Sequence, residues 1–209
     1  MRSTRLFHDF LKRTFDLMGA FVLTIVLSPV LLVLFILVRM KMGKPALFKQ
    51  VRAGKDARPF VMWKFRSMVF AEDANGNPLP DAERMTPFGR ALRRSSMDEL
   101  PQLWNVLKGE MSFVGPRPLY LEYVPNYSPE QRRRLDVKPG ITGLAQIAGR
   151  NTLGWADRLR LDVEYVDRAS LWLDLSILLR TVRKVLFKEG VPTNGVDPNR
   201  KFQGTPKPG

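Results

Sequence analysis

The sequence predicts a mainly helical α+β protein that carries an apolar membrane segment near its N-terminus. Three observations predict this class. Residues 15–38 are almost entirely apolar, residues 44–70 hold β-branched and aromatic stretches, and from Thr86 onward apolar residues recur at helical spacing. The chain has 209 residues, which suits one domain with an added membrane element.

The apolar segment has a break in its middle. After Asp16 it runs apolar for longer than the roughly 20 residues that a bilayer span requires, and no cleavage site for a signal peptide follows it. Pro29 removes the amide that would bond the carbonyl of Ile25, which bends or breaks a helix. The hydroxyl of Ser28 can bond back to a carbonyl one turn earlier and fix the bend.

Basic residues flank the segment on both sides. The positive-inside rule therefore gives no preferred direction, because each flank favours the cytoplasm. A kinked span and a hairpin that enters and leaves on one face are both compatible with this pattern. The flanking residues are Arg2, Arg5, Lys12 and Arg13 before the segment and Arg39, Lys41, Lys44, Lys49 and Arg52 after it.

Strands are expected next. The stretches ALFKQVRAG and PFVMWKFRSMVF, separated by a Gly-Lys-Asp turn, predict two strands or extended segments within residues 44–70. Residues 71–83 are polar and turn-rich, which indicates a surface loop.

Helices are expected in the remainder of the chain, and Gly109 closes the second of them. The last helix has a basic C-terminal end and either packs on the core or lies in the lipid interface. Residues 191–209 are rich in Pro, Gly and Asn and predict a loosely ordered tail. The helices are expected over residues 88–92, 100–107, 155–165 and 171–187, with a further start at Ser128-Pro129.

Charge and composition limit the chemistry. Lys and Arg number 34 against 20 Asp and Glu, so the net charge of +14 favours binding to nucleic acid, anionic lipid or phosphorylated substrates. Cysteine is absent and His8 is the one histidine, which excludes disulfides and leaves no material for a zinc site or a histidine-based triad. Any catalytic chemistry must therefore use carboxylates, Arg, Lys and hard metal ions.

Asp98 and Glu99 form an acidic pair between a basic stretch and an apolar helix. One interpretation is structural: acids complement the helix dipole, and Ser96-x-x-Glu99 matches a capping box. The other is chemical, because a helix N-terminus attracts phosphate. Asp98 could then hold Mg²⁺ together with phosphate oxygens, or attack phosphorus itself.

Cations occur in further motifs. Arg117 lies between two prolines, which make it a rigid fork for phosphate. Lys64 and Arg66 share one side of an extended segment. Each motif alone is also explained by loop rigidity or by solvated charge.

A glycine-punctuated loop, KPGITG, and the motif Gly149-Arg150-Asn151 bracket Gln146. Neither matches the P-loop or the dinucleotide fingerprint, whose spacing is different. Turn structure explains each of them alone.

Taken together, these residues resemble the bacterial sugar transferases, the monotopic polyprenyl-phosphate phosphoglycosyl transferases. The match covers most of positions 12–190 in the family's order, and its most specific block is 98–119. Ala148 departs from the pattern, since many relatives carry asparagine there. The matching motifs are KRTFD, Ser28-Pro29, KFRSM, DELPQLWNVLKGEMSFVGPRPL and KPGITGLAQIAGRN.

The resemblance implies a re-entrant membrane helix over 1–43, broken at Ser28 and Pro29, and a compact cytoplasmic catalytic domain over 44–190 with interfacial amphipathic helices. The protein would lie in the bacterial inner membrane with its active site on the cytoplasmic face. The chain begins almost at the Lys-Arg-x-x-Asp element, so it resembles the small form of the family.

The resemblance also implies roles for the site residues. Asp98 would be the nucleophile and a Mg²⁺ ligand, and Glu99 would assist proton transfer. The arginines match positions around the family's active site, where they would neutralise a diphosphate. The predicted substrate-binding set is Lys64, Arg66, Arg93, Arg117, Gln146 and Arg150.

The implied reaction moves a phosphosugar from a UDP-sugar to undecaprenyl phosphate, releases UMP and starts a surface polysaccharide or glycoprotein glycan. The lipid bilayer is an expected partner, nucleic acid is not, and a homo-oligomer is compatible with the sequence. The alternative is a membrane-tethered basic adaptor that binds nucleic acid or anionic lipid through its charge. UMP release from UDP-sugars discriminates between the two.

Overall fold

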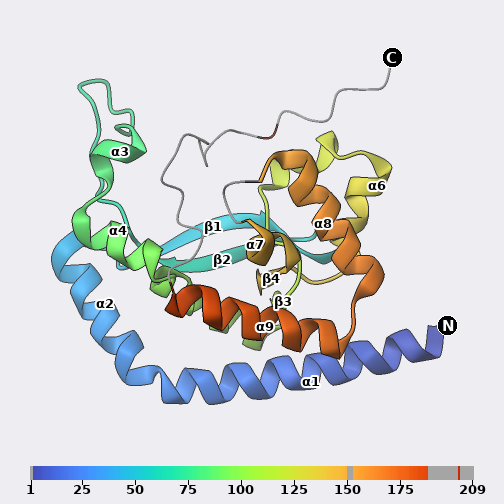
Figure 1. Ribbon diagram of the computed structural model, residues 1–209. Helices are drawn as coiled ribbons and strands as arrows, with labels where there is room; N and C mark the ends of the chain where they lie inside the picture. The colour runs from blue at the N-terminus through green and yellow to red at the C-terminus, as the bar shows by residue number, and fades with distance from the viewer. Residues whose placement is uncertain (1, 150–152, 188–201, 203–209) are drawn as a thin grey trace.

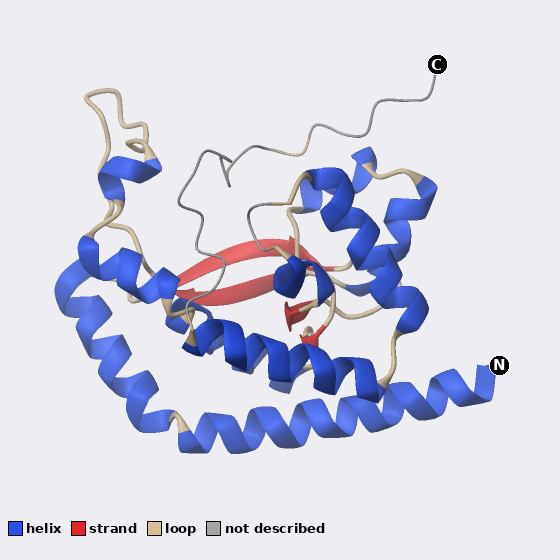
Figure 2. Ribbon diagram, in the orientation of Figure 1, coloured by secondary structure: helices blue, strands red, loops and turns tan. Residues whose placement is uncertain are grey.

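Two long N-terminal helices form a bent arm along one side of a body of short helices and two small sheets (Figure 1). The computed structural model describes residues 2–149, 153–187 and 202. The arm consists of α1 (Arg2–Val26) and α2 (Ser28–Met42). Figure 2 shows that helices predominate in the body and that the strands lie near its centre, which confirms the predicted mainly helical α+β class.

The elements of the body are short. Its strands are β1 (Leu47–Ala53), β2 (Pro59–Phe65), β3 (Ser112–Val114) and β4 (Gly140–Thr142). Its α-helices are α3 (Asp81–Arg84), α4 (Pro87–Arg94), α5 (Leu103–Lys108), α6 (Pro129–Arg132), α7 (Leu144–Ala148), α8 (Trp155–Arg168) and α9 (Leu171–Leu186). Its 3₁₀ turns are η1 (Lys55–Ala57), η2 (Met97–Gln102), η3 (Leu121–Asn126) and η4 (Arg133–Leu135).

The bend in the arm lies where the sequence predicts it. The axes of the two helices differ by 64°, and Leu27 separates them. Pro29 cannot donate to the carbonyl of Ile25, and the Ser28 hydroxyl donates to it instead at 2.7 Å. In the part of the chain that the structure describes, no single helix is long and apolar enough to cross a membrane, but the bent pair meets both criteria together.

The first half of the arm is bound to the body by polar contacts. Lys12 Nζ lies 2.5 Å from the carboxylate of Asp174 on α9. Arg13 donates to two carbonyls at the C-terminal end of α5, at 2.6 and 2.9 Å. Asp16 accepts a hydrogen bond from the amide of Phe113 at 3.1 Å. These contacts fix α1 against the body beside α9 (Figure 1).

The other end of the arm contacts the same body through apolar packing. Val38 and Met42 of α2 are buried in a cluster with Phe65 of β2 and Leu92 of α4. Both halves of the arm therefore dock on one folded unit, on either side of the bend.

The strands and helices agree with the sequence in most places. The two predicted strands are β1 and β2, and they pair as an antiparallel hairpin with Leu47 opposite Phe65 and Ala53 opposite Pro59. The predicted loop over 71–83 is wrong at its end, because α3 begins at Asp81. The predicted helix over 100–107 is α-helical only from Leu103, because Pro101 lies within a 3₁₀ turn that precedes it.

The last helix, α9, uses two faces. Ile177 is fully buried in the core beside Tyr165. The opposite face leaves large apolar side chains exposed at helical spacing, so core packing is confirmed for one face of α9 and the interfacial position stays a prediction for the other. The exposed residues are Trp172, Leu175, Leu179 and Val182.

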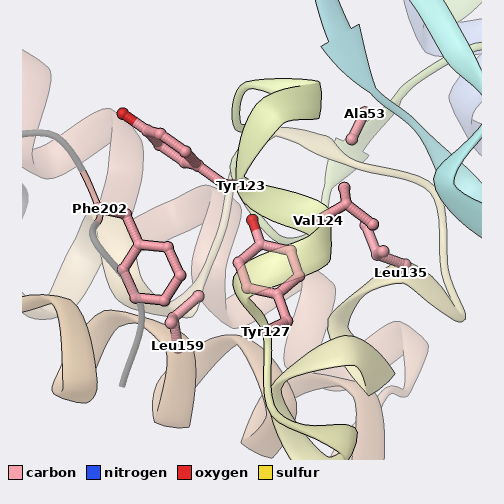
Figure 3. Close-up of a cluster of buried hydrophobic side chains, with 7 residues drawn as sticks. All are labelled: Ala53, Tyr123, Val124, Tyr127, Leu135, Leu159 and Phe202. Atoms are coloured by element: carbon pink, nitrogen blue, oxygen red, sulfur yellow. The ribbon is translucent and has the colours of Figure 1, made fainter. Parts of the chain in front are cut away.

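One aromatic residue of the predicted tail is buried in the body. Phe202 is 6 % exposed and contacts Tyr123, Tyr127 and Leu159 (Figure 3). Its ring centroid lies 5.6 Å from that of Tyr127 and 5.8 Å from that of Tyr123. The rest of the predicted tail, residues 191–209, lies outside the described residues.

Replacing Phe202 with alanine is expected to lower the free energy of unfolding by about 3 kcal/mol, because the change leaves a cavity among aromatic rings. Urea unfolding followed by fluorescence measures the change. The control is Phe187→Ala, since Phe187 is 70 % exposed and its removal leaves no cavity. Equal, small losses in both variants would contradict the burial of Phe202.

Candidate active site

The two acidic residues lie on η2, which follows α4 after a tight turn. Ser96 takes the left-handed conformation there, with φ 58°, and its side chain makes no capping bond. The amide of Glu99 instead donates to the backbone carbonyl of Ser96 at 3.1 Å. The predicted capping box is therefore wrong, because the amide that it needs is already bonded to the backbone.

Glu99 is held by two cations. Its Oε1 accepts from Lys64 Nζ at 2.7 Å and from Arg117 Nη2 at 2.8 Å. Burial opposes ionisation of Glu99, but Arg117 and Lys64 outweigh it and lower the pKa of the carboxyl well below its usual range. Glu99 is therefore a fixed anion that positions the ends of Lys64 and Arg117.

Asp98 has the opposite environment. It is 7 % exposed, and among the described residues no side chain donates a hydrogen bond to its carboxylate. Burial, followed by the neighbouring charge of Glu99, raises the pKa of Asp98 to about 6, although Lys64, Arg117 and Arg93 oppose the rise. Adjacent carboxyls whose pKa values move apart are suited to different roles, and Asp98 is the one left uncommitted.

Of two further predicted cations, Arg93 lies near Asp98 and Arg66 contacts other groups. Arg93, in the last turn of α4, donates to the Ser67 hydroxyl at 2.8 Å and lies close enough to lower the pKa of Asp98. Arg66 donates to the carbonyl of Lys44 at 3.1 Å, and its guanidinium lies 4.5 Å from the ring of Phe70.

The sequence predicted that Lys64 and Arg66 lie on one side of an extended segment. In the structure they do not come together at the carboxylates of Asp98 and Glu99. The reason is that β2 ends at Phe65, so the alternation of a strand does not extend to Arg66. Lys64 alone reaches Glu99.

Gln146 lies on α7 with both amide atoms shielded from solvent and, within the described residues, without hydrogen-bond partners. Buried amides in native proteins are usually satisfied, so this one is available to a ligand or to water. Arg150, the last member of the predicted set, lies outside the described residues.

Sequence reasoning missed the support behind Arg117. Arg134 donates to the backbone carbonyl of Arg117 at 2.6 Å and to Asp162 at 2.7 Å. Arg134 and Asp162 are both buried. The sequence does not indicate this, because Arg134 ends a run of three arginines, a pattern that is typical of a solvent-exposed surface. No local signal in the sequence pairs it with Asp162, which is 28 residues away.

The family model of the bacterial sugar transferases matches residues 7–188 of this chain. The chain belongs to this family. The resemblance seen in the sequence motifs is thus confirmed, and a sugar transferase is favoured over the basic adaptor.

Three curated proteins show how this sugar transferase relates to others. It is 53 % identical over 196 residues to the uncharacterized sugar transferase EpsL of Bacillus subtilis, covering 93 % of this chain and 96 % of that protein. It is 41 % identical over 190 residues to the UDP-glucose:undecaprenyl-phosphate glucose-1-phosphate transferase of Caulobacter vibrioides, covering 85 % of this chain and 70 % of that one.

The third relative is longer. Identity to the undecaprenyl-phosphate galactose phosphotransferase of Salmonella typhimurium is 39 % over 206 residues, which covers 90 % of this chain and 42 % of that protein. This sugar transferase therefore spans less than half of that relative's length.

Proposed function

We propose that this sugar transferase moves a sugar 1-phosphate from a UDP-sugar to undecaprenyl phosphate and releases UMP, a reaction that starts the synthesis of a surface glycan. The Caulobacter and Salmonella relatives carry names that describe this class of transfer. The observation that carries the proposal is the uncommitted carboxylate of Asp98 beside cations that Glu99 holds in place.

The charge around Asp98 suits a phosphorylated substrate. Lys64, Arg93 and Arg117 act on Asp98 together, and Glu99 neutralises only part of their charge. The surplus positive charge attracts a diphosphate and stabilises the negative charge that develops as the bond to phosphorus changes.

The chemistry follows in two displacements. A carboxylate oxygen of Asp98 attacks the phosphorus that bears the sugar, and the bond from that phosphorus to the bridging oxygen breaks, so that UMP leaves with the bridging oxygen. An oxygen of undecaprenyl phosphate then attacks the same phosphorus, the bond to Asp98 breaks, and the carboxylate is restored. Glu99 keeps Lys64 and Arg117 in place in both steps, and its role in proton transfer stays a prediction.

A magnesium ion fits this donor set. The described residues contain no cluster of three or more His, Cys, Asp or Glu that would hold a metal by itself. Mg²⁺ commonly takes one or two carboxylates and completes its shell with phosphate oxygens and water. Asp98 would supply the carboxylate, and the bound ion would offset the charge of the diphosphate.

The arm supports a re-entrant position in the bacterial inner membrane. Lys12 in one half of the arm and Met42 at the end of the other both contact the same body. A bilayer entered by the bend would therefore leave both ends of the arm on one side. A straight span would separate these two contacts. The exposed apolar stripe of α9, which Lys12 joins to the arm through Asp174, would lie at the same lipid surface.

The experiment that tests the proposal is a screen of UDP-sugars for UMP release with undecaprenyl phosphate in detergent or nanodiscs. We expect release with at least one UDP-sugar, complete loss in EDTA, and recovery with Mg²⁺ or Mn²⁺. Full turnover in chelator would remove the metal from the proposal. Absence of UMP release with every UDP-sugar would refute the donor class.

A further inference from the structure

Arg52 of β1 is held in a fixed orientation by two neighbours. Its guanidinium lies over the ring of Tyr120, 3.6 Å from the centroid. Gln50 Oε1 accepts from Arg52 Nε at 3.1 Å and also from Nη2, while Gln50 Nε2 donates to the Tyr120 hydroxyl at 3.0 Å. The three side chains close a ring of contacts that leaves the guanidinium little freedom.

The charge of Arg52 is not neutralised by the protein. Across the described ranges Arg52 forms no ion pair, and its hydrogen bonds to Gln50 use Nε and Nη2 but not Nη1. Burial lowers the pKa of Arg52, Tyr120 partly restores it, and the nearby charge of Arg117 lowers it further. A half-buried guanidinium beside a second one is unfavourable unless an anion lies near both.

The position of Arg52 follows from the groups that act on it. The amide of Ala53 donates to the carbonyl of Leu119 at 3.0 Å, and Arg52 lies over the ring of Tyr120, so β1 runs beside the segment that follows Arg117. Arg117 itself donates to Glu99 at 2.8 Å. Arg52 is therefore held next to the segment that carries Arg117, and Arg117 contacts the immediate neighbour of the carboxylate that we assign as nucleophile.

We propose that Arg52, oriented by Gln50 and Tyr120, binds the nucleotide-side phosphate of the UDP-sugar. This inference rests on the proposed function. Asp98 has to reach the sugar-bearing phosphorus, so the second phosphate of the same diphosphate extends away from it, past Arg117. A stacked guanidinium with free edge donors binds phosphate oxygens with little loss of side-chain entropy. It also stabilises the charge that the leaving phosphate acquires.

The test compares Arg52→Gln with Arg58→Gln, a matched control in the same hairpin whose side chain is exposed. Titration calorimetry with UDP, UMP and uridine measures binding without turnover. Arg52→Gln is expected to weaken UDP and UMP by about tenfold or more and to leave uridine unchanged, because charge-assisted hydrogen bonds are lost only where phosphate is present. Arg58→Gln should bind all three like the parent.

Kinetics separates Arg52 from the acceptor. In Arg52→Gln, KM for the UDP-sugar should rise while KM for undecaprenyl phosphate stays unchanged. Arg52→Lys keeps the charge and loses the fork, so it should give an intermediate loss. If Arg52→Gln does not fold, Arg52→Lys still tests the inference.

Two results would overturn this inference while the proposed function stands: unchanged UDP and UMP binding in both Arg52 variants, or a rise in KM for undecaprenyl phosphate alone. Failure of the parent protein to release UMP from any UDP-sugar would instead overturn the proposed function.

Discussion

Asp98→Asn is expected to abolish UMP release and, in the absence of metal, to leave the protein at least as stable as the parent. Asparagine keeps the shape but removes the nucleophile and the charged ligand. Because the pKa of Asp98 is raised to about 6 in the folded protein, ionising this carboxyl destabilises the fold as the pH rises from the unfolded pKa to the folded one. That cost is absent below the unfolded pKa and almost fully present at pH 7, so the substitution removes on the order of 3 kcal/mol of destabilisation.

Glu99→Gln is expected to change stability in the opposite direction. It leaves Lys64 and Arg117 without the carboxylate that both contact. The pair with Lys64 is largely buried, and breaking it costs on the order of 3 kcal/mol, whereas Arg117 is half-exposed and its pair adds little. Activity should fall because both cations lose their position. Urea unfolding of the two variants in EDTA at pH 7 gives the comparison. A destabilised Asp98→Asn beside an unaffected Glu99→Gln would reverse the assigned environments.

The second large effect concerns the arm. Because both of its halves dock on one body, cysteines introduced at positions 3 and 205 of this cysteine-free chain should be labelled from the same side of inverted membrane vesicles. An impermeant maleimide added to intact spheroplasts should label neither. Labelling of the two positions from opposite sides would refute the re-entrant topology.

Pro29→Ala gives the matching functional test. Alanine restores the amide that can bond the carbonyl of Ile25, which favours a straighter helix and competes with the Ser28 hydroxyl for that carbonyl. We expect lower activity and a fraction of molecules with opposite labelling at the two ends. The control is Val30→Ala, one residue later in the same helix, which removes apolar side-chain atoms but leaves the proline and therefore the bend in place.

The sequence was sufficient for features that depend on local chemistry. The break at Ser28-Pro29, the two strands β1 and β2 and the helix start at Ser128-Pro129 each follow from a few adjacent residues, and the structure confirms them. The acidic pair was found, but its environment was not, because the capping interpretation considered only the helix to which Glu99 belongs. The contacts of Glu99 come from β2 and from the loop after β3.

Contacts between residues far apart in the chain could not be predicted from the sequence. The parallel pair β3–β4 joins segments of three residues each, which are too short for a periodic signal. The partners Arg134 and Asp162 lie on different elements, and each alone resembles a surface charge. Arg66 was predicted to lie on the same side as Lys64 because side chains alternate along a strand, but β2 ends at Phe65, one residue before Arg66.

The most direct test of the central claim is to trap the phosphosugar on the enzyme. The protein is incubated with Mg²⁺ and the UDP-sugar that supports turnover, without undecaprenyl phosphate, and is quenched and analysed by intact and peptide mass spectrometry. The predicted result is one added sugar phosphate on the peptide that contains Asp98, released on addition of undecaprenyl phosphate and absent from Asp98→Asn. If UMP appears only when both substrates are bound and no adduct forms, the lipid phosphate attacks the donor directly, and Asp98 is not the nucleophile.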